Sequence, residues 1–181
     1  MCAKLYTQYA ASVNTVFQIK MIESIQLGAR SDALYVIRQA AVHLIDHQKT
    51  LWPLDELTAE QVFHGCQHDN IVTGYIGANP IAAMLLTYHD PTFWPDVPPN
   101  QAGFIHKLSV VPDYQGKGVA AQMVDFARNE VKNKEIPWLR LDCHSDRNRL
   151  RNFYESLGFR CVREGIADAH PTAFYEIEVY R

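Results

Sequence analysis

Residues 104–131 show both of the hydrophobic periods that the chain uses. Over residues 104–110 the even-numbered positions are mostly apolar and the odd-numbered ones mostly polar, which predicts a strand with two unlike faces. A turn containing Gly116 and Gly118 interrupts this alternation. Over residues 119–131 apolar side chains return every three or four positions, which predicts an amphipathic helix. The stretch is therefore predicted to be a strand, a glycine-containing turn and a helix in succession.

The same two periods predict the remaining elements. Strands are expected at residues 22–27, 70–76, 81–88, 138–143, 159–163 and 173–179, and helices at residues 32–48, 58–64 and 147–157. Ser31 and Thr58 are the expected N-caps of the first two helices, and Ser145 or Asp146 that of the last. Gly158 stands where a left-handed residue would close the last helix. With about seven strands and about four helices, the predicted fold class is α/β (α+β).

Two segments fit neither period. Residues 1–20 suit a short helix or an extra strand and stay unassigned, while residues 21–181 are expected to form a single domain. Residues 90–101 contain four prolines, which rules out a helix or an inner strand there. Phe93 and Trp94 in this loop either line a pocket or cover the core, and the sequence leaves both interpretations open.

The composition is that of an ordinary globular domain. Of 181 residues, 48% are hydrophobic and 20% are charged, which suits one core. The net charge of −3 lacks the basic excess of a nucleic-acid-binding protein, so no nucleic-acid partner is expected. Neither a signal peptide nor an apolar run of about 18 residues is visible, so no membrane partner is expected. The scattered cysteines indicate reduced thiols and a cytoplasmic protein: Cys2, Cys66, Cys143 and Cys161.

The turn at residues 115–120 has the chemistry of an anion site. A helix begins with about four unpaired backbone N–H groups, and the small residues Gly116, Gly118 and Ala120 would let an anion approach them. Lys117 adds a positive charge, so the turn suits a pyrophosphate. The alternative is an ordinary turn between a strand and a helix, because short glycine patterns often occur by chance.

Two segments taken together resemble the GNAT superfamily of acyl-CoA-dependent N-acetyltransferases. Gln115-Gly116-Lys117-Gly118-Val119-Ala120 is similar to the family's Q/R-x-x-G-x-G/A loop, and Asn152-Phe153-Tyr154-Glu155-Ser156-Leu157-Gly158-Phe159 is similar to its F-Y-E-x-L-G-F helix end. The resemblance covers nearly all of residues 22–179. It implies a mixed, mostly antiparallel sheet in which the fourth strand, ending at Val110, splays from residues 138–143 and leaves a V-shaped cleft.

The resemblance also implies acetyl-CoA as the co-substrate and suggests which residues bind it. The implied contacts are the main chain of Leu108 and Val110 for pantetheine and the amides of Gln115, Gly116, Lys117, Gly118, Val119 and Ala120 for pyrophosphate. The family usually has an asparagine at the start of the helix that carries the tyrosine, and in this sequence Arg147 stands at that position. Either Asn148 makes the contact of that asparagine, or Arg147 reaches a CoA phosphate. A bulge is expected at Val110 and Val111, where two apolar residues are adjacent.

Two residues are candidates for proton transfer. Tyr154 matches the family's tyrosine near the CoA sulfur, and a phenol is a proton donor at neutral pH; the alternative is a core tyrosine. His106, expected on the same face as Leu108 and Val110, is the candidate base; the alternative is a structural histidine. The pairs His43/His47 and His64/His68 lack a matching carboxylate, so no metal is expected.

These observations lead to one functional prediction. The protein is expected to be an N-acetyltransferase that moves an acetyl group from acetyl-CoA to a primary amine by direct attack in a ternary complex. The acidic net charge and the loop with Phe93 and Trp94 favour a small-molecule amine as the substrate. The alternatives are a catalytically silent acyl-CoA sensor and a binding module that does not use CoA. The chain is expected to be a monomer or a homodimer.

Overall fold

The computed structural model describes residues 21–49 and 51–180. Residues 1–20, which the sequence analysis leaves unassigned, lie outside the described residues. The described chain contains seven strands and four α-helices, the numbers that the periodicity predicts. Among the helices between residues 21 and 180, none has both the length and the hydrophobicity that a membrane span requires.

The elements follow one another in the predicted order. The strands are β1 (Ser24–Leu27), β2 (Ile71–Ile76), β3 (Asn79–Thr87), β4 (Ala102–Val110), β5 (Trp138–His144), β6 (Arg160–Ala167) and β7 (His170–Glu178). The helices are α1 (Arg30–Asp46), α2 (Ala59–Val62), α3 (Val119–Asn133) and α4 (Asn148–Ser156), with short 3-10 helices η1 (His68–Asn70) and η2 (Pro112–Tyr114).

One sheet in the order β1-β2-β3-β4-β5-β7-β6 connects all the strands of the described chain. Its neighbouring strands are antiparallel except for β4 and β5, which run parallel. The strands predicted at residues 70–76 and 81–88 form a β-hairpin, with Ile76 opposite Asn79. The prediction of a mixed, mostly antiparallel sheet is confirmed.

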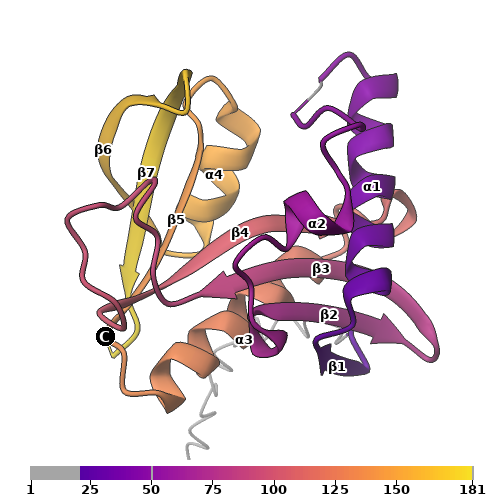
Figure 1. Cartoon of the computed structure of the whole chain (residues 1–181), viewed down its shortest axis with the longest axis horizontal. Coiled ribbons are helices and arrows are strands. Elements are labelled where there is room, and N and C mark those ends of the chain that lie inside the picture. The colour runs from indigo at the N-terminus through magenta and orange to yellow at the C-terminus, as the bar shows by residue number, and fades with distance from the viewer. Residues whose placement is uncertain (1–20, 50, 181) are drawn as a thin grey trace, which may run out of the picture.

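The sheet forks between β4 and β5. These strands pair from Ala102 opposite Trp138 to Ile105 opposite Leu141 and no further within the described chain. Beyond that point β4 stays paired with β3 as far as Val110, while β5 stays paired with β7 as far as His144. Figure 1 shows the two groups of strands leaving a common corner in different directions. The predicted V-shaped splay is confirmed.

Helices cover both faces of the first half of the sheet (Figure 1). Ala83 and Leu85 of β3 pack with α1 and α2 in one core, while Ala82 and Met84 pack with α3 in another. Adjacent residues of a strand point to opposite faces, so β3 separates the two cores. Helix α4 joins the α3 core through Tyr154, on the part of the sheet that contains β5 and β7.

The predicted bulge exists, but the prediction of its position was wrong. His106 lies opposite Leu85 and Ser109 lies opposite Ala83, so β4 has one residue more than β3 in this interval. Lys107, with φ of +49°, takes up the extra residue. Val111 instead continues the pairing by donating its N–H to Ile81 at 3.0 Å.

The two helix caps predicted from serine or aspartate are wrong, and the other two predicted caps are confirmed. Helix α1 begins at Arg30, so Ser31 already lies inside its first turn, and Arg147 precedes α4 in place of Ser145 or Asp146. Thr58 caps α2 by accepting the N–H of Gln61 at 3.2 Å. Gly158 follows α4 with a φ of +88°, in the left-handed region.

The aromatic side chains of the loop at residues 90–101 cover the sheet. Trp94 is buried and stacks edge-on against Phe174 of β7, with ring centroids 5.4 Å apart. Phe104 of β4 is also in this cluster, and Phe93 packs against it. The structure therefore supports the core-covering interpretation for Trp94, and it also brings Asp90, at the start of the loop, to the fork.

Candidate active site

The fork presents different side chains on its two faces. Val110 lies opposite Ala82 and therefore faces α3, whereas His106 lies opposite Leu85 and faces α1 and α2. The expectation that His106 shares a face with Val110 was wrong, because the bulge at Lys107 changes the alternation between them. A ligand between the strands would therefore meet Val110 from one side and His106 from the other.

The predicted anion loop leaves its backbone donors open. Gly116 and Gly118 have φ of +73° and +82°, and Gly118 is the N-cap of α3. A Cβ at Gly116 would meet no atom of the described chain within 4 Å. Within residues 21–49 and 51–180, the N–H groups of Gly116, Lys117 and Gly118 make no hydrogen bond. The loop and the first turn of α3, with Val119 and Ala120, thus offer donors to an anion.

The first residue of this loop is tied to the end of β4. The Gln115 side chain donates its Nε2 to the carbonyl of Val110 at 3.0 Å. Lys117 is exposed, and its Nζ lies 5.6 Å from the ring centre of Tyr114. Leu108, at the bulge, packs against the α3 core. The structure therefore brings Val110 and the anion loop together at one end of the fork.

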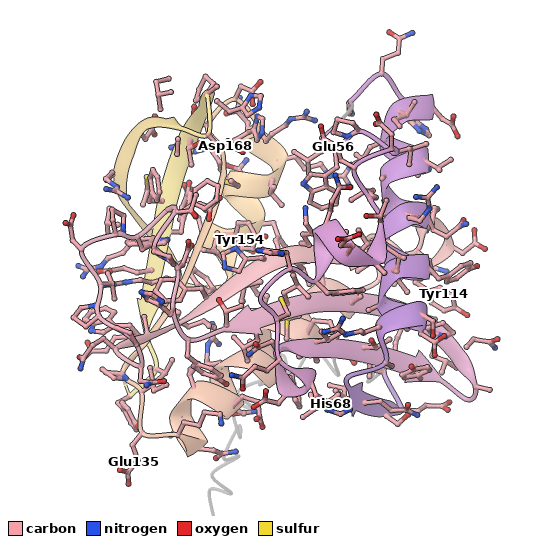
Figure 2. The ribbon with its side chains drawn as sticks, viewed as in Figure 1. Glu56, His68, Tyr114, Glu135, Tyr154 and Asp168 are labelled. Atoms are coloured by element: carbon pink, nitrogen blue, oxygen red, sulfur yellow. The ribbon has the colours of Figure 1, made fainter. Side chains whose placement is uncertain are left out.

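Tyr154 is held between the core and the fork. Its side chain is 5% exposed and packs against Phe159 and Tyr175, while its hydroxyl makes no hydrogen bond within the described residues. Burial, together with the charges of Cys143 and Asp142, raises the pKa of the Tyr154 phenol. In Figure 2, Tyr154 lies between α4 and the segment that carries α2, over the region where β4 leaves β5.

A polar network fixes α4 on the sheet. Arg151 donates to the hydroxyl of Tyr175 at 3.0 Å, and this hydroxyl donates to Glu155 at 2.8 Å. From the other side, Arg128 of α3 donates to the carbonyl of Leu157 at 2.9 Å, at the end of α4. These contacts involve the middle and the C-terminal end of the helix, on both sides of Tyr154, so they hold Tyr154 in position.

The two residues proposed to replace the family's asparagine lie at the start of α4. Arg147 is the N-cap, and its Nη1 donates to the carbonyl of Lys49 at 3.3 Å. Its Nε lies 3.8 Å from Asp146, while Asn148 is exposed as the first residue of the helix. In this structure the Arg147 side chain is directed at the segment after α1, and the two alternatives remain predictions.

Two carboxylates that were not predicted from the sequence lie beside His106. Asp90 follows β3, and its Oδ2 lies 3.7 Å from Nε2 of His106. Burial lowers the pKa of His106. The charge of Asp90 acts to raise this pKa, and the charge of Lys107 lowers it further. Burial, and then the charge of Asp90, raises the pKa of Asp142 to about 7. The sequence of β5 could have indicated Asp142 as a site residue. Polar Arg140, Asp142 and His144 alternate there with buried residues, on a central strand.

The three side chains also form the one metal-capable group in the described residues. Potential ligand atoms of Asp90, His106 and Asp142 lie within 4.8 Å of one another. Of the histidine pairs considered earlier, His43 and His47 have ring centroids 4.2 Å apart, and Nδ1 of His47 is 2.7 Å from the carbonyl oxygen of His43.

The forked sheet, with a glycine turn at the start of α3 and a tyrosine near the fork, is the arrangement that the sequence resemblance implies. The chain matches the Acetyltransferase (GNAT) family over residues 31–159 and belongs to it. It is 29% identical over 90 residues to the uncharacterized N-acetyltransferase YesJ of Bacillus subtilis, a match that covers 50% of this chain and 48% of YesJ. The chain thus spans about half the length of that relative.

Solved structures share the fold. A GNAT-family acetyltransferase from Listeria monocytogenes has a TM-score of 0.69 at 20% identity, covering 86% of this chain and 94% of its own. The PaiA N-acetyltransferase of Thermoplasma acidophilum, crystallised with coenzyme A, has a TM-score of 0.64 at 15% identity, covering 86% of this chain and 98% of its own. At such identities the likeness concerns the fold alone.

Proposed function

We propose that the protein transfers the acetyl group of acetyl-CoA to a primary amine by direct attack in a ternary complex. The observation that carries the proposal is the parting of β4 and β5 after Ile105 and Leu141. Past this point the edge of β4 that faces β5 has no strand partner in the described chain. A pantetheine arm carries two amides, so it can pair with this edge as a short strand would.

The neighbouring loop supports the same ligand. A pantetheine arm beside Leu108 and Val110 would lead its pyrophosphate to the unpaired N–H groups of Gly116, Lys117 and Gly118. Gln115 already donates to the Val110 carbonyl, so a pantetheine amide would exchange with the Gln115 side chain there. The N-terminus of α3 adds the positive end of a helix dipole.

Tyr154 is suited to protonate the leaving thiolate. Because burial raises the pKa of its phenol, the hydroxyl keeps its proton at neutral pH. A hydroxyl without a partner in the described chain is free to donate to a ligand sulfur. We assign Tyr154 the role of general acid.

His106 is suited to accept a proton from the amine. Because burial lowers the pKa of His106, the imidazole is neutral at neutral pH. It accepts one proton from the ammonium and passes it to solvent; the nitrogen lone pair then forms the C–N bond. As the C–S bond breaks, its electron pair stays on sulfur, which takes the proton of Tyr154. The second nitrogen proton restores the phenol, so one proton is released per turnover.

Calorimetry with coenzyme A, followed by a thiol-release assay with acetyl-CoA and primary amines, tests the proposal. We expect heat of binding and amine-dependent thiol release. Gly116→Asp should abolish the heat by placing a carboxylate among the anion donors. Gly65→Asp is the matched control, since Gly65 has a φ of +70° and its Cβ would also meet no described atom within 4 Å.

Three results would count against the proposal in different ways. An absence of heat with the unaltered protein would remove the CoA site. Equal heats for the two glycine variants would remove the loop from that site. Binding without thiol release for every amine would leave a silent acyl-CoA-binding protein.

A further inference from the structure

Three ionisable side chains from three segments meet where the sheet forks. Asp90 follows β3, His106 lies in β4 and Asp142 lies in β5, with their side-chain ligand atoms within 4.8 Å of one another. His106 and Asp142 come directly after Ile105 and Leu141, the last paired residues of the two strands. The cluster therefore occupies the base of the fork on the face of α1 and α2, opposite the anion loop side.

The carboxylates of this cluster lack a cation. Asp90 is 6% exposed, and while its Oδ1 accepts the N–H of Phe93, its Oδ2 is buried without a hydrogen bond in the described chain. Within residues 21–49 and 51–180, no lysine or arginine forms an ion pair with Asp90 or Asp142. Two neighbouring carboxylates in a partly buried site are unfavourable unless a cation joins them.

The spacing of the cluster lies between those of a metal site and of an ammonium site, and the proposed transfer to an amine favours the ammonium. Acceptors that share one tetrahedral nitrogen through hydrogen bonds of about 2.8 Å lie about 4.6 Å apart. Ligands of zinc at about 2.1 Å lie only about 3.4 Å apart. The observed atoms are 3.7 Å apart for Asp90 and His106, and within 4.8 Å for the whole set. His106 is 23% exposed, so a ligand can reach the cluster.

We propose that Asp90, His106 and Asp142 form the receptor for the protonated amino group of the acceptor, so that the acceptor is a primary alkylammonium. This inference rests on the proposed acetyl transfer and specifies its substrate. The two carboxylates hold the ammonium by charge-assisted hydrogen bonds. His106 takes the proton that must leave before the nitrogen attacks.

The receptor also selects against one class of amines. A free amino acid carries a carboxylate beside its amino group, which Asp90 and Asp142 would repel. Two cations near the cluster are already engaged: Lys107 with the ring of Trp52 at 4.7 Å, and Arg140 of β5 with Glu176 at 3.0 Å. The acceptor is therefore an amine without a neighbouring carboxylate.

The test compares acceptors of different charge in three variants. At about pH 7.5, butylamine is an ammonium and 2,2,2-trifluoroethylamine is neutral. Asp90→Asn and Asp142→Asn should each raise the KM for butylamine about tenfold or more, with the KM for acetyl-CoA unchanged. The loss should shrink to about twofold for trifluoroethylamine, because a neutral amine gains little from a carboxylate. Asp96→Asn, an exposed residue of the same loop, is the control for charge.

The outcomes separate this inference from the proposed function. Losses of equal size for both amines, or unchanged KM values for butylamine, would overturn the receptor. Preference for alanine over butylamine would overturn it too, as would loss of activity in a chelator with recovery on adding zinc. In each case, if the protein still binds CoA, the proposed acetyl-CoA site is not contradicted. If a variant does not fold, NMR on the unaltered protein with coenzyme A decides instead. We expect the protein to broaden the signals of butylamine and to leave those of alanine unchanged.

Discussion

Tyr154 shows how one side chain serves both packing and proposed chemistry. Its ring belongs to the core with Phe159 and Tyr175, while its hydroxyl makes no hydrogen bond in the described chain. The hydroxyl is also not among the fully buried polar atoms without a partner, so it borders space that a ligand can enter. The open hydroxyl is therefore the part of the residue that we connect with the reaction.

Tyr154→Phe separates the two roles. Removing the hydroxyl should lower kcat about 100- to 10,000-fold, the usual size of a general-acid contribution. The affinity for coenzyme A and the free energy of unfolding should change little, because no hydrogen bond of the described chain is lost. Steady-state kinetics and calorimetry provide the measurements.

Tyr35→Phe is the matched control, since Tyr35 is 52% exposed on α1. If Tyr154→Phe turns over as fast as this control, the phenol is a core residue only.

Helix α3 approaches β4 closely, and this contact aligns the anion loop with the fork. A Cβ on Gly103 would lie 2.2 Å from Cγ1 of Val131, so the helix can pack here only against a glycine. Helix α3 begins at the anion loop, and β4 forms one side of the fork. The packing of α3 on β4 therefore sets the position of the loop relative to the fork. A residue far from any ligand thereby supports the site.

Gly103→Ala should therefore destabilise the protein. The added methyl has to displace Val131 or shift α3, at a cost of about 1–3 kcal/mol in the free energy of unfolding. Urea denaturation measures the effect as a lower midpoint. Gly165→Ala in β6 is the control, since its Cβ would meet no described atom within 4 Å. Equal midpoints for the two variants would contradict the close packing of α3 on β4.

The molecule consists of two groups of strands with few connections between them. In the described chain, β4 and β5 share four residue pairs, whereas β5 and β7 share seven. The fork is possible because each group has its own partners: β3 and two cores support β4, while β7 and α4 support β5. Above neutral pH the carboxylates at the base of the fork lower the stability of the fold, because Asp142 is largely buried and lies beside Asp90.

The pH dependence of folding should reveal this cost. Burial and Asp90 raise the pKa of Asp142 from 3.8 to about 7, so the folded protein binds the proton more tightly than the unfolded chain. The contribution of Asp142 to stability is complete below its unfolded pKa and is lost as pH rises through about 7. The lowered pKa of His106 acts in the opposite direction, so the variant is compared with the unaltered protein at each pH.

Asp142→Asn should be more stable than the unaltered protein at about pH 8 and gain much less at about pH 5. Urea denaturation at both pH values gives the two differences. Asp96→Asn, exposed in the loop before β4, should show no such trend. A gain for Asp142→Asn that does not depend on pH would show that Asp142 has an ordinary pKa.

The sequence by itself determined the elements, their order and the glycine turn before α3. Hydrophobic periodicity located the seven strands and four helices, because each element buries one face at its own spacing. Gly116, Gly118 and Gly158 were recognisable because their left-handed backbone is a local property. The family resemblance supplied the mixed sheet and the fork, which depend on strands that are far apart in sequence.

Only the tertiary structure decided the register and the residues that meet at the fork. The bulge at Lys107 depends on how β4 pairs with β3, so the sequence placed it wrongly at Val110 and Val111 and put His106 on the wrong face. Asp90 and Asp142 are 52 positions apart and show no shared motif. They meet because a loop returns to the sheet at the point where two strands separate, and such proximity follows from packing rather than from local pattern.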